Sequence, residues 1–177
     1  MKNGVVIADS GPIISLALID KLHILDSIFD EVKIANAVWK ELTRDESKSF
    51  IDRIKLYFKD KICKITGFNE LTFIMDYGES ESLILYNEIE ADFLLIDDKK
   101  ARNIAENFGM KCIGTLGLLS IAKDKNLITE LRPIFIEFLK NKRFYALNLM
   151  NLILEQNEEE AITTMLTVPN SDKNKHS

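Results

Sequence analysis

The chain has 177 residues, of which 46% are hydrophobic and 29% charged, and its formal net charge is −5. This length fits one domain with a small appendage, and the hydrophobic content suffices for a sizeable core. The weak negative charge excludes a tight, non-specific nucleic-acid binder, but it allows a nuclease that makes few phosphate contacts.

The first third of the chain predicts two short strands separated by helices. Residues 4–8 are apolar and branched, which is typical of a strand buried on both faces. Gly11-Pro12 breaks this strand and starts a helix, since proline is tolerated in a first helical turn. Hydrophobic spacing then predicts helices at 22–28, 37–42 and 50–58, and a strand at 32–34.

The rest of the chain continues the alternation of strands and helices. Residues 66–77 look irregular or partly helical, and the stripe over 101–108 ends at Gly109, a helix stop. The other predicted strands are 62–65, 93–96 and 111–113, and the other predicted helices are 79–90, 116–124, 129–140 and 148–157.

This alternation predicts an α/β fold: three layers, α/β/α, around a central, mostly parallel sheet of about five strands, followed by C-terminal helices. We expect the domain to span residues 1–155. The tail, 156–177, is polar and acidic, and we expect it to be partly disordered.

The composition also limits the cellular location of the protein and the kinds of metal that it could bind. The only cysteines, Cys63 and Cys112, predict two buried thiols, and the two histidines lie near neither of them, which excludes a structural zinc site. No apolar stretch approaches the roughly 20 residues that span a bilayer, and the N-terminus does not resemble a signal peptide. We therefore expect a cytoplasmic protein without a membrane partner.

Acidic residues stand where two apolar strands end. Asp9 directly follows the first predicted strand, and Asp97-Asp98 follow the strand at 93–96. In a parallel sheet these ends open onto the same edge, where ligand crevices form. Carboxylates gathered there repel one another unless a cation or a shared proton lies between them. This arrangement predicts a divalent-metal site.

Three further acids are less informative when each is taken alone. Glu41 lies beside Lys40 in a predicted helix and fits a solvated helix face. Glu79 and Glu81 open the helix before the 93–96 strand, where the helix dipole favours carboxylates. The sequence leaves open which of these two glutamates would join a metal site.

The order of these motifs resembles the PIN domain family. The strand followed by Asp9-Ser10, the Gly78-Glu79-Ser80-Glu81 start of a helix, the segment 91–102 and Ile113-Gly114-Thr115-Leu116-Gly117 all recur in its toxin-related subfamily of uncharacterised prokaryotic proteins. The resemblance covers roughly residues 4–155. At the position after Ser10 the chain has Gly11, where the family more usually has a serine.

The resemblance implies a metal-dependent ribonuclease with an acidic site that holds Mg²⁺ or Mn²⁺. By position it implies the catalytic residues Asp9, Glu41, Glu81 and Asp98, and a metal-binding set that adds Glu79 and Asp97. Such ions prefer oxygen ligands, activate a bound water and neutralise charge on a phosphate. The expected target is single-stranded or loop RNA, whose backbone can bend into a crevice.

Several residues are candidates for binding the RNA. The basic residues after Asp98 fit either contacts to flanking phosphates or a solvated helix face. Trp39 fits core packing better than base stacking. The substrate-binding candidates are Ser10, Lys99, Lys100, Arg102 and Thr115.

Other readings remain open at this stage. A haloacid-dehalogenase-type phosphatase needs Asp-x-Asp after the first strand, and a receiver domain needs an early acidic pair, and neither order fits Asp9-Ser10-Gly11. The alternative is a catalytically inert PIN-like protein that binds a partner. The resemblance also implies possible partners, a small antitoxin or a second copy of the chain, and the apolar segment 147–154 fits either such an interface or a core helix.

Overall fold

The computed structural model describes residues 3–143 and 145–163. The chain forms two compact units, Met1–Leu118 and Leu119–Ser177. The first unit holds the whole sheet, and the second holds the C-terminal helices. No helix in the described ranges is long and apolar enough to cross a membrane.

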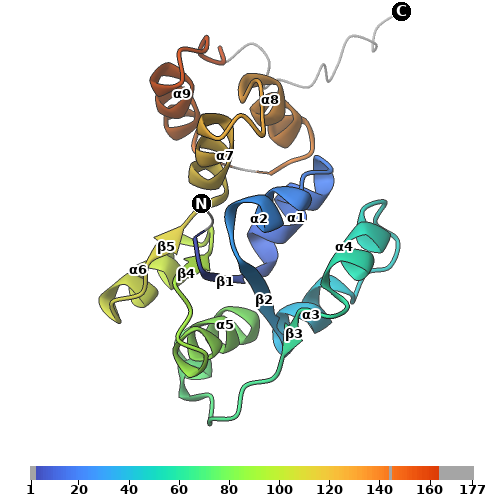
Figure 1. Ribbon diagram of the computed structural model, residues 1–177, viewed down its shortest axis with the longest axis vertical. Helices are drawn as coiled ribbons and strands as arrows, with labels where there is room; N and C mark the ends of the chain where they lie inside the picture. Colours follow the sequence, from blue (N-terminus) through green and yellow to red (C-terminus); the bar gives the residue numbers. More distant parts are fainter. Residues whose placement is uncertain (1–2, 144, 164–177) are drawn as a thin grey trace, which may run out of the picture. The chain divides into compact units, whose positions relative to one another are not determined.

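The first unit is built on a five-stranded sheet in which every strand pair is parallel (Figure 1). The strand order is β3-β2-β1-β4-β5, so β1 and β4 lie side by side at the centre. This confirms the predicted parallel α/β sheet. The strands are β1 Val5–Ala8, β2 Glu31–Ala35, β3 Ile62–Cys63, β4 Phe93–Leu95 and β5 Cys112–Ile113.

Helices connect successive strands of this sheet. Helices flank the sheet, which gives the predicted three layers (Figure 1). Among them, α5 packs along β1, β2 and β4 and also contacts α3. The helices are α1 Ser10–Leu18, α2 His23–Ile28, α3 Asn36–Leu42, α4 Ile51–Phe58, the 3-10 turn η1 Glu70–Phe73, α5 Tyr77–Glu88 and α6 Lys99–Asn107.

The central strand β1 is held by burial and by a contact at its start. Its apolar residues Val6, Ile7 and Ala8 are fully buried, which explains their uninterrupted hydrophobic run. Before the strand, Gly4 has a φ of 62°, and a Cβ there would overlap the Asp92 carboxylate, which accepts the Val5 N–H at 2.7 Å. The position of the strand therefore fixes the position of Asp9, the residue that follows it.

The start of α5 differs from the prediction. The helix begins at Tyr77 rather than Glu79, because Asp76 caps it: the Asp76 side chain accepts an N–H of the first turn, and the Glu79 side chain accepts the Asp76 N–H. This capping box satisfies two of the backbone donors that a helix start leaves without partners. Its Asp-x-x-Glu spacing is readable in the sequence and would have located the helix start.

The two cysteines are free, as predicted, but each is partly exposed rather than buried. Cys63 lies in β3 and Cys112 in β5. These are the edge strands of the sheet, and each is covered by a neighbouring strand on one side only. The prediction of two buried thiols was therefore wrong.

The second unit contains α8 Arg132–Lys140 and α9 Leu147–Gln156, and α7 Thr115–Asp124 leads into it. The Glu159 carboxylate accepts the N–H groups of Leu131 and Arg132, each at 2.7 Å, and so ties the segment after α9 to the start of α8. Further along, the Ile162 N–H donates to the Asn151 side chain of α9 at 2.8 Å. Residues 164–177 lie outside the described part of the chain.

Candidate active site

The site lies at the carboxyl ends of β1 and β4. Asp9 follows β1 directly, and its N–H donates to the Leu95 carbonyl of β4 at 2.9 Å. From β1 the chain crosses toward β3, whereas from β3 it returns across the sheet to β4, so the connections diverge between these two strands. A crevice at such a switch point is where ligands bind in open α/β sheets.

Asp9 is the buried acid of this site, with 5% of its surface exposed. Its Oδ1 atom is buried and has no hydrogen-bond partner within the described residues. Burial raises the pKa of Asp9 to about 7, and the charges of Glu41 and Glu79 add to the shift, while the backbone N–H groups of Ser10 and Gly11 oppose it. A buried carboxylate with one oxygen left without a partner is stabilised when it binds a proton or a cation.

Glu41 joins the site from α3. Its Oε1 accepts the Ser10 hydroxyl at 3.0 Å, which links the end of α3 to the start of α1. Its Oε2 lies against Gly78 of α5, where an added Cβ would stand 2.9 Å away. Ser10, a predicted substrate-binding residue, thus holds the Glu41 carboxylate in place.

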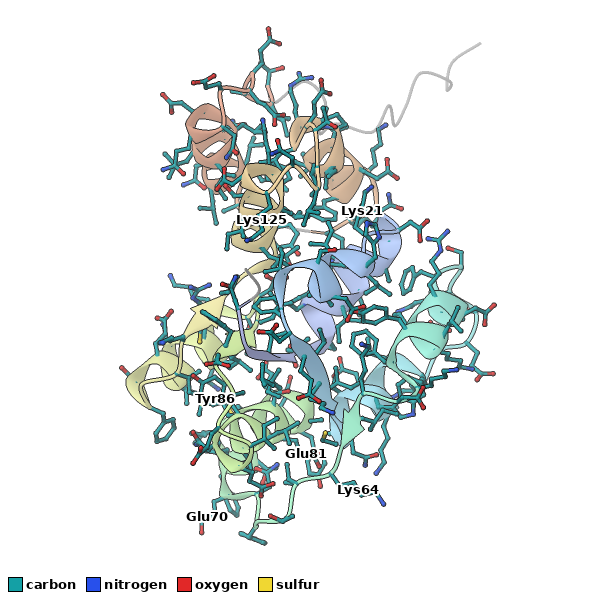
Figure 2. The ribbon with its side chains drawn as sticks, viewed as in Figure 1. Lys21, Lys64, Glu70, Glu81, Tyr86 and Lys125 are labelled. Atoms are coloured by element: carbon teal, nitrogen blue, oxygen red, sulfur yellow. The ribbon has the colours of Figure 1, made fainter. Side chains whose placement is uncertain are left out.

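Glu79 and Glu81, between which the sequence leaves the choice of ligand open, have different surroundings in the structure. Burial raises the pKa of the half-buried Glu79, and the charges of Asp98 and Glu41 raise it further, so Glu79 belongs to the acidic group. Glu81 is buried and projects from α5 toward α3 (Figure 2). There its Oε2 accepts the Ala37 N–H at 2.8 Å. This bond links α5 to the first turn of α3.

We expect substitutions of these two glutamates to have opposite effects. Glu79→Gln should reduce activity without lowering stability, because it removes a charge that its neighbours repel. Glu81→Ala should lower the free energy of unfolding by about 1–3 kcal/mol, because the buried Ala37 N–H loses its acceptor. Urea unfolding and RNA cleavage assays on both variants check this. Loss of cleavage in Glu81→Gln at unchanged stability would instead return Glu81 to the site.

The two aspartates after β4 also have different surroundings. Both carboxylate oxygens of Asp97 accept hydrogen bonds from Thr115, one from its N–H and one from its hydroxyl, each at 2.7 Å. Asp97 therefore anchors the start of α7, and Thr115, a predicted substrate-binding residue, is buried in that anchor. Asp98 is exposed and caps α6 by accepting the Ala101 N–H at 2.8 Å.

The basic residues after Asp98 are not equivalent. Lys99 and Lys100 are exposed in the first turn of α6, beside the acidic group. Arg102 donates from Nε to Glu106 at 2.8 Å and from Nη2 to the Cys112 carbonyl at 3.1 Å. The two lysines are therefore the better placed of the three to contact a phosphate.

The donors of this site suit a hard divalent cation. Asp9, Glu41, Glu79 and Asp98 offer carboxylate oxygens only, which are the ligands Mg²⁺ and Mn²⁺ prefer, and the partnerless Oδ1 of Asp9 is one such donor. In the part of the chain that the structure describes, no group of three or more His, Cys, Asp and Glu side chains is arranged to hold a metal ion as it stands. The donor set fits such an ion in its chemistry.

Gly78 provides a test of how closely Glu41 must be placed. Gly78→Ala puts a methyl group against the Glu41 carboxylate, which can turn away because it is the end of a flexible side chain. We expect cleavage to fall by on the order of 10- to 100-fold, since small misplacements of catalytic groups have effects of this size. Stability should hold, because alanine favours a helix more than glycine does. An unchanged rate would show that the position of Glu41 is unimportant.

The comparison with protein families agrees with this geometry. The family model described as DUF3368: PIN domain matches residues 5–159. The chain belongs to the PIN domain family. That family is one of nucleases, which typically use divalent metals, so a nucleic-acid substrate fits the acidic sheet edge of this PIN domain. No curated protein and no solved structure matches the chain.

Proposed function

We propose that this PIN domain is a metal-dependent endoribonuclease that hydrolyses RNA phosphodiesters at the carboxyl edge of its sheet. The observation that carries the proposal is Asp9, a buried carboxylate without a partner for Oδ1 in the described residues, whose pKa is raised by burial and by the neighbouring Glu41 and Glu79. Such a group is costly to keep unless it serves a cation or a proton.

In this proposal Asp9, Glu41, Glu79 and Asp98 hold Mg²⁺ or Mn²⁺. A bound ion of this kind lowers the pKa of a water molecule and offsets charge on the phosphate. Ser10 keeps the Glu41 carboxylate oriented through its hydroxyl. A carboxylate that is not fully used as a ligand accepts the proton of the attacking water. Asp97 and Glu81 support these residues by fixing α7 and α3.

The substrate in this proposal is single-stranded or loop RNA. Lys99 and Lys100 are exposed beside Asp98 and can contact the phosphates that flank the cleaved bond. An unpaired strand can bend so that one phosphate reaches a recessed carboxylate, whereas a duplex is stiffer. The small net charge fits a nuclease that relies on few such contacts.

The biological setting we favour is a cytoplasmic toxin controlled by a small antitoxin protein, with an RNA-processing nuclease as the alternative. On α9, Leu149 and Leu152 are exposed while Met150, Ile153 and Leu154 are buried, so one helix face is open to an antitoxin or to a second copy of the chain. A small gene next to this one would favour the toxin. The alternative is a catalytically inert PIN domain that binds a partner. The absence of any cleavage activity in the wild-type protein would favour it.

The proposal is tested on a mixed RNA pool incubated with Mn²⁺ or with EDTA, followed by analysis of the new RNA ends. We expect cleavage only with the metal. Attack by water breaks the phosphorus–oxygen bond and leaves linear phosphate and hydroxyl ends. Cleavage by the purified protein that persists in EDTA and leaves 2′,3′-cyclic phosphates would mean attack by the RNA's own 2′-hydroxyl, and this would contradict a water-based metal site.

A further inference from the structure

A pocket of about 420 Å³ adjoins the acidic group between α3 and the start of α5. It shares Glu41 with the candidate active site, so anything bound in it lies next to that carboxylate. Its volume falls in the roughly 300–1,000 Å³ range of pockets that take small organic groups. Its walls are formed by Ala37, Lys40, Glu41, Arg44, Asp76, Tyr77 and Gly78.

Two cations of this pocket are available for a ligand. Lys40 and Arg44 are exposed, and neither forms an ion pair with any residue in the ranges 3–143 and 145–163. Lys40 lies in the last turn of α3 and Arg44 follows the end of that helix, and both side chains line the pocket. Asp76 also lines the pocket, but its carboxylate is engaged in capping α5. The pocket therefore offers an anion two nearby donors.

The same pocket presents an aromatic ring. Tyr77 is 58% exposed, although it is the first residue of α5 and its backbone is held by the Asp76–Glu79 capping box. A rigidly mounted and exposed ring is suited to stack on an unpaired nucleobase, as proteins that bind single strands commonly do. Stacking tolerates any base, because every base has an aromatic face.

We propose that this pocket binds one nucleotide of the single-stranded RNA beside the scissile phosphate, an inference that rests on the proposed function and deepens it. Tyr77 stacks on the base, and Lys40 and Arg44 hold the adjoining phosphate. Glu41 forms the boundary with the acidic site, so a nucleotide held here places the next phosphate at the carboxylates. The pocket selects unpaired RNA and reads no particular base.

The test is the affinity for a fluorescein-labelled single-stranded RNA, measured by anisotropy in EDTA over a range of salt concentrations, so that cleavage plays no part. Tyr77→Ala should weaken binding about tenfold, as loss of one base–aromatic stack does, and Tyr77→Phe should restore it. Lys40→Ala combined with Arg44→Ala should weaken binding and reduce the slope of log K against log salt by about 0.7, the contribution of one neutralised phosphate on a single strand.

Matched controls remove similar groups that do not line the pocket. Phe108→Ala deletes an aromatic ring that is 60% exposed after α6. Lys21→Ala with Lys59→Ala deletes two positive charges that follow α1 and α4, and Lys21 lies at the end of α1 away from Glu81 (Figure 2). These variants should bind as the wild type does, with the salt slope reduced by clearly less than in the pocket variant. The fully paired form of the same RNA should not respond to Tyr77→Ala, because its bases are already stacked.

The two claims fail separately. If the pocket variants bind single-stranded RNA as tightly as their controls, the pocket inference is overturned, even if the wild type cleaves RNA with Mn²⁺. If binding depends on Tyr77, Lys40 and Arg44 as described but Mn²⁺ produces no cleavage, the pocket stands and the proposed nuclease function falls.

Discussion

Replacement of Asp9 by asparagine is expected to reduce metal-dependent RNA cleavage by at least roughly 100-fold, the size of effect that loss of a metal-holding or proton-accepting group produces. Asparagine has nearly the same shape but no charge, so it weakens the hold on a divalent ion. The fold should survive, because Asp9 is buried and its Oδ1 has no partner in the described residues. Stability near pH 8 should even rise, since a buried charge is removed.

The measurement compares cleavage rates and urea unfolding of the wild type, Asp9→Asn and Asp60→Asn. Asp60 is exposed beside the start of β3, at the opposite edge of the sheet, and serves as the matched control. Asp60→Asn should cleave at the wild-type rate. If Asp9→Asn cleaves as fast as the wild type, Asp9 has no part in the reaction; if it unfolds more readily near pH 8, the cost assigned to its charge is wrong.

The second large effect is a dependence of stability on pH that divalent metal should cancel. The pKa of Asp9 is about 7 in the folded protein, against about 3.9 in an unfolded chain. Between these values the folded state holds the extra proton, so stability falls as pH rises from about 4 to about 7 and then levels off. The loss is on the order of 4 kcal/mol. The raised pKa of Glu79 acts in the same direction.

The clean readout is the difference between wild type and Asp9→Asn, because carboxylates that do not interact with Asp9 titrate equally in both. Glu159, for example, has a pKa lowered by hydrogen bonds from Leu131, Lys123 and Arg132, and so has the opposite pH dependence. Thermal unfolding at about pH 5 and pH 8 should show a larger Mn²⁺ stabilisation at pH 8, where the ion no longer competes with a proton. Equal stabilisation at both pH values, or in both proteins, would contradict binding through Asp9.

The sequence predicted the strands and the two acids that end them because that information is local. A short branched apolar run is a buried strand in almost any setting, and the residue after it must emerge at the sheet edge. Asp9 and Asp98 therefore lie where the pattern placed them, at the ends of β1 and β4. The order of the strands confirmed that these ends are neighbours.

The choice between Glu79 and Glu81 was not local. Two residues apart on a helix, their side chains point to nearly opposite sides. The packing of α3 against α5 determines which of the two side chains faces the other acidic residues. The Ala37 N–H that donates to Glu81 belongs to α3. Asp97 and Asp98 pose the same problem, because the Thr115 donors that occupy Asp97 arrive from after β5. The local sequence around Glu81 or Asp97 therefore does not reveal these hydrogen-bond partners, which are distant in the chain.

The pocket residues escaped the sequence reading for a related reason. Lys40 looks like part of an ordinary solvated helix face, Arg44 falls in the polar stretch after that helix, and Tyr77 looks like a loop residue until the capping box at Asp76 is recognised. Only the approach of α5 to α3 makes them neighbours of Glu41. Whether exposed lysines, arginines and tyrosines form a binding site depends on their arrangement in space, which the order of residues in the sequence does not show.

The most direct test of the central claim is single-turnover cleavage of a mixed RNA pool by wild type and by Asp98→Asn, each with Mn²⁺ and with EDTA. Asparagine is as good a helix cap as aspartate, so this variant keeps the bond to the Ala101 N–H and loses only charge. A metal-dependent endoribonuclease should cleave with Mn²⁺ in the wild type and lose that cleavage in the variant. Equal cleavage by the two proteins, or none in either together with no Mn²⁺ shift in thermal unfolding, would contradict it.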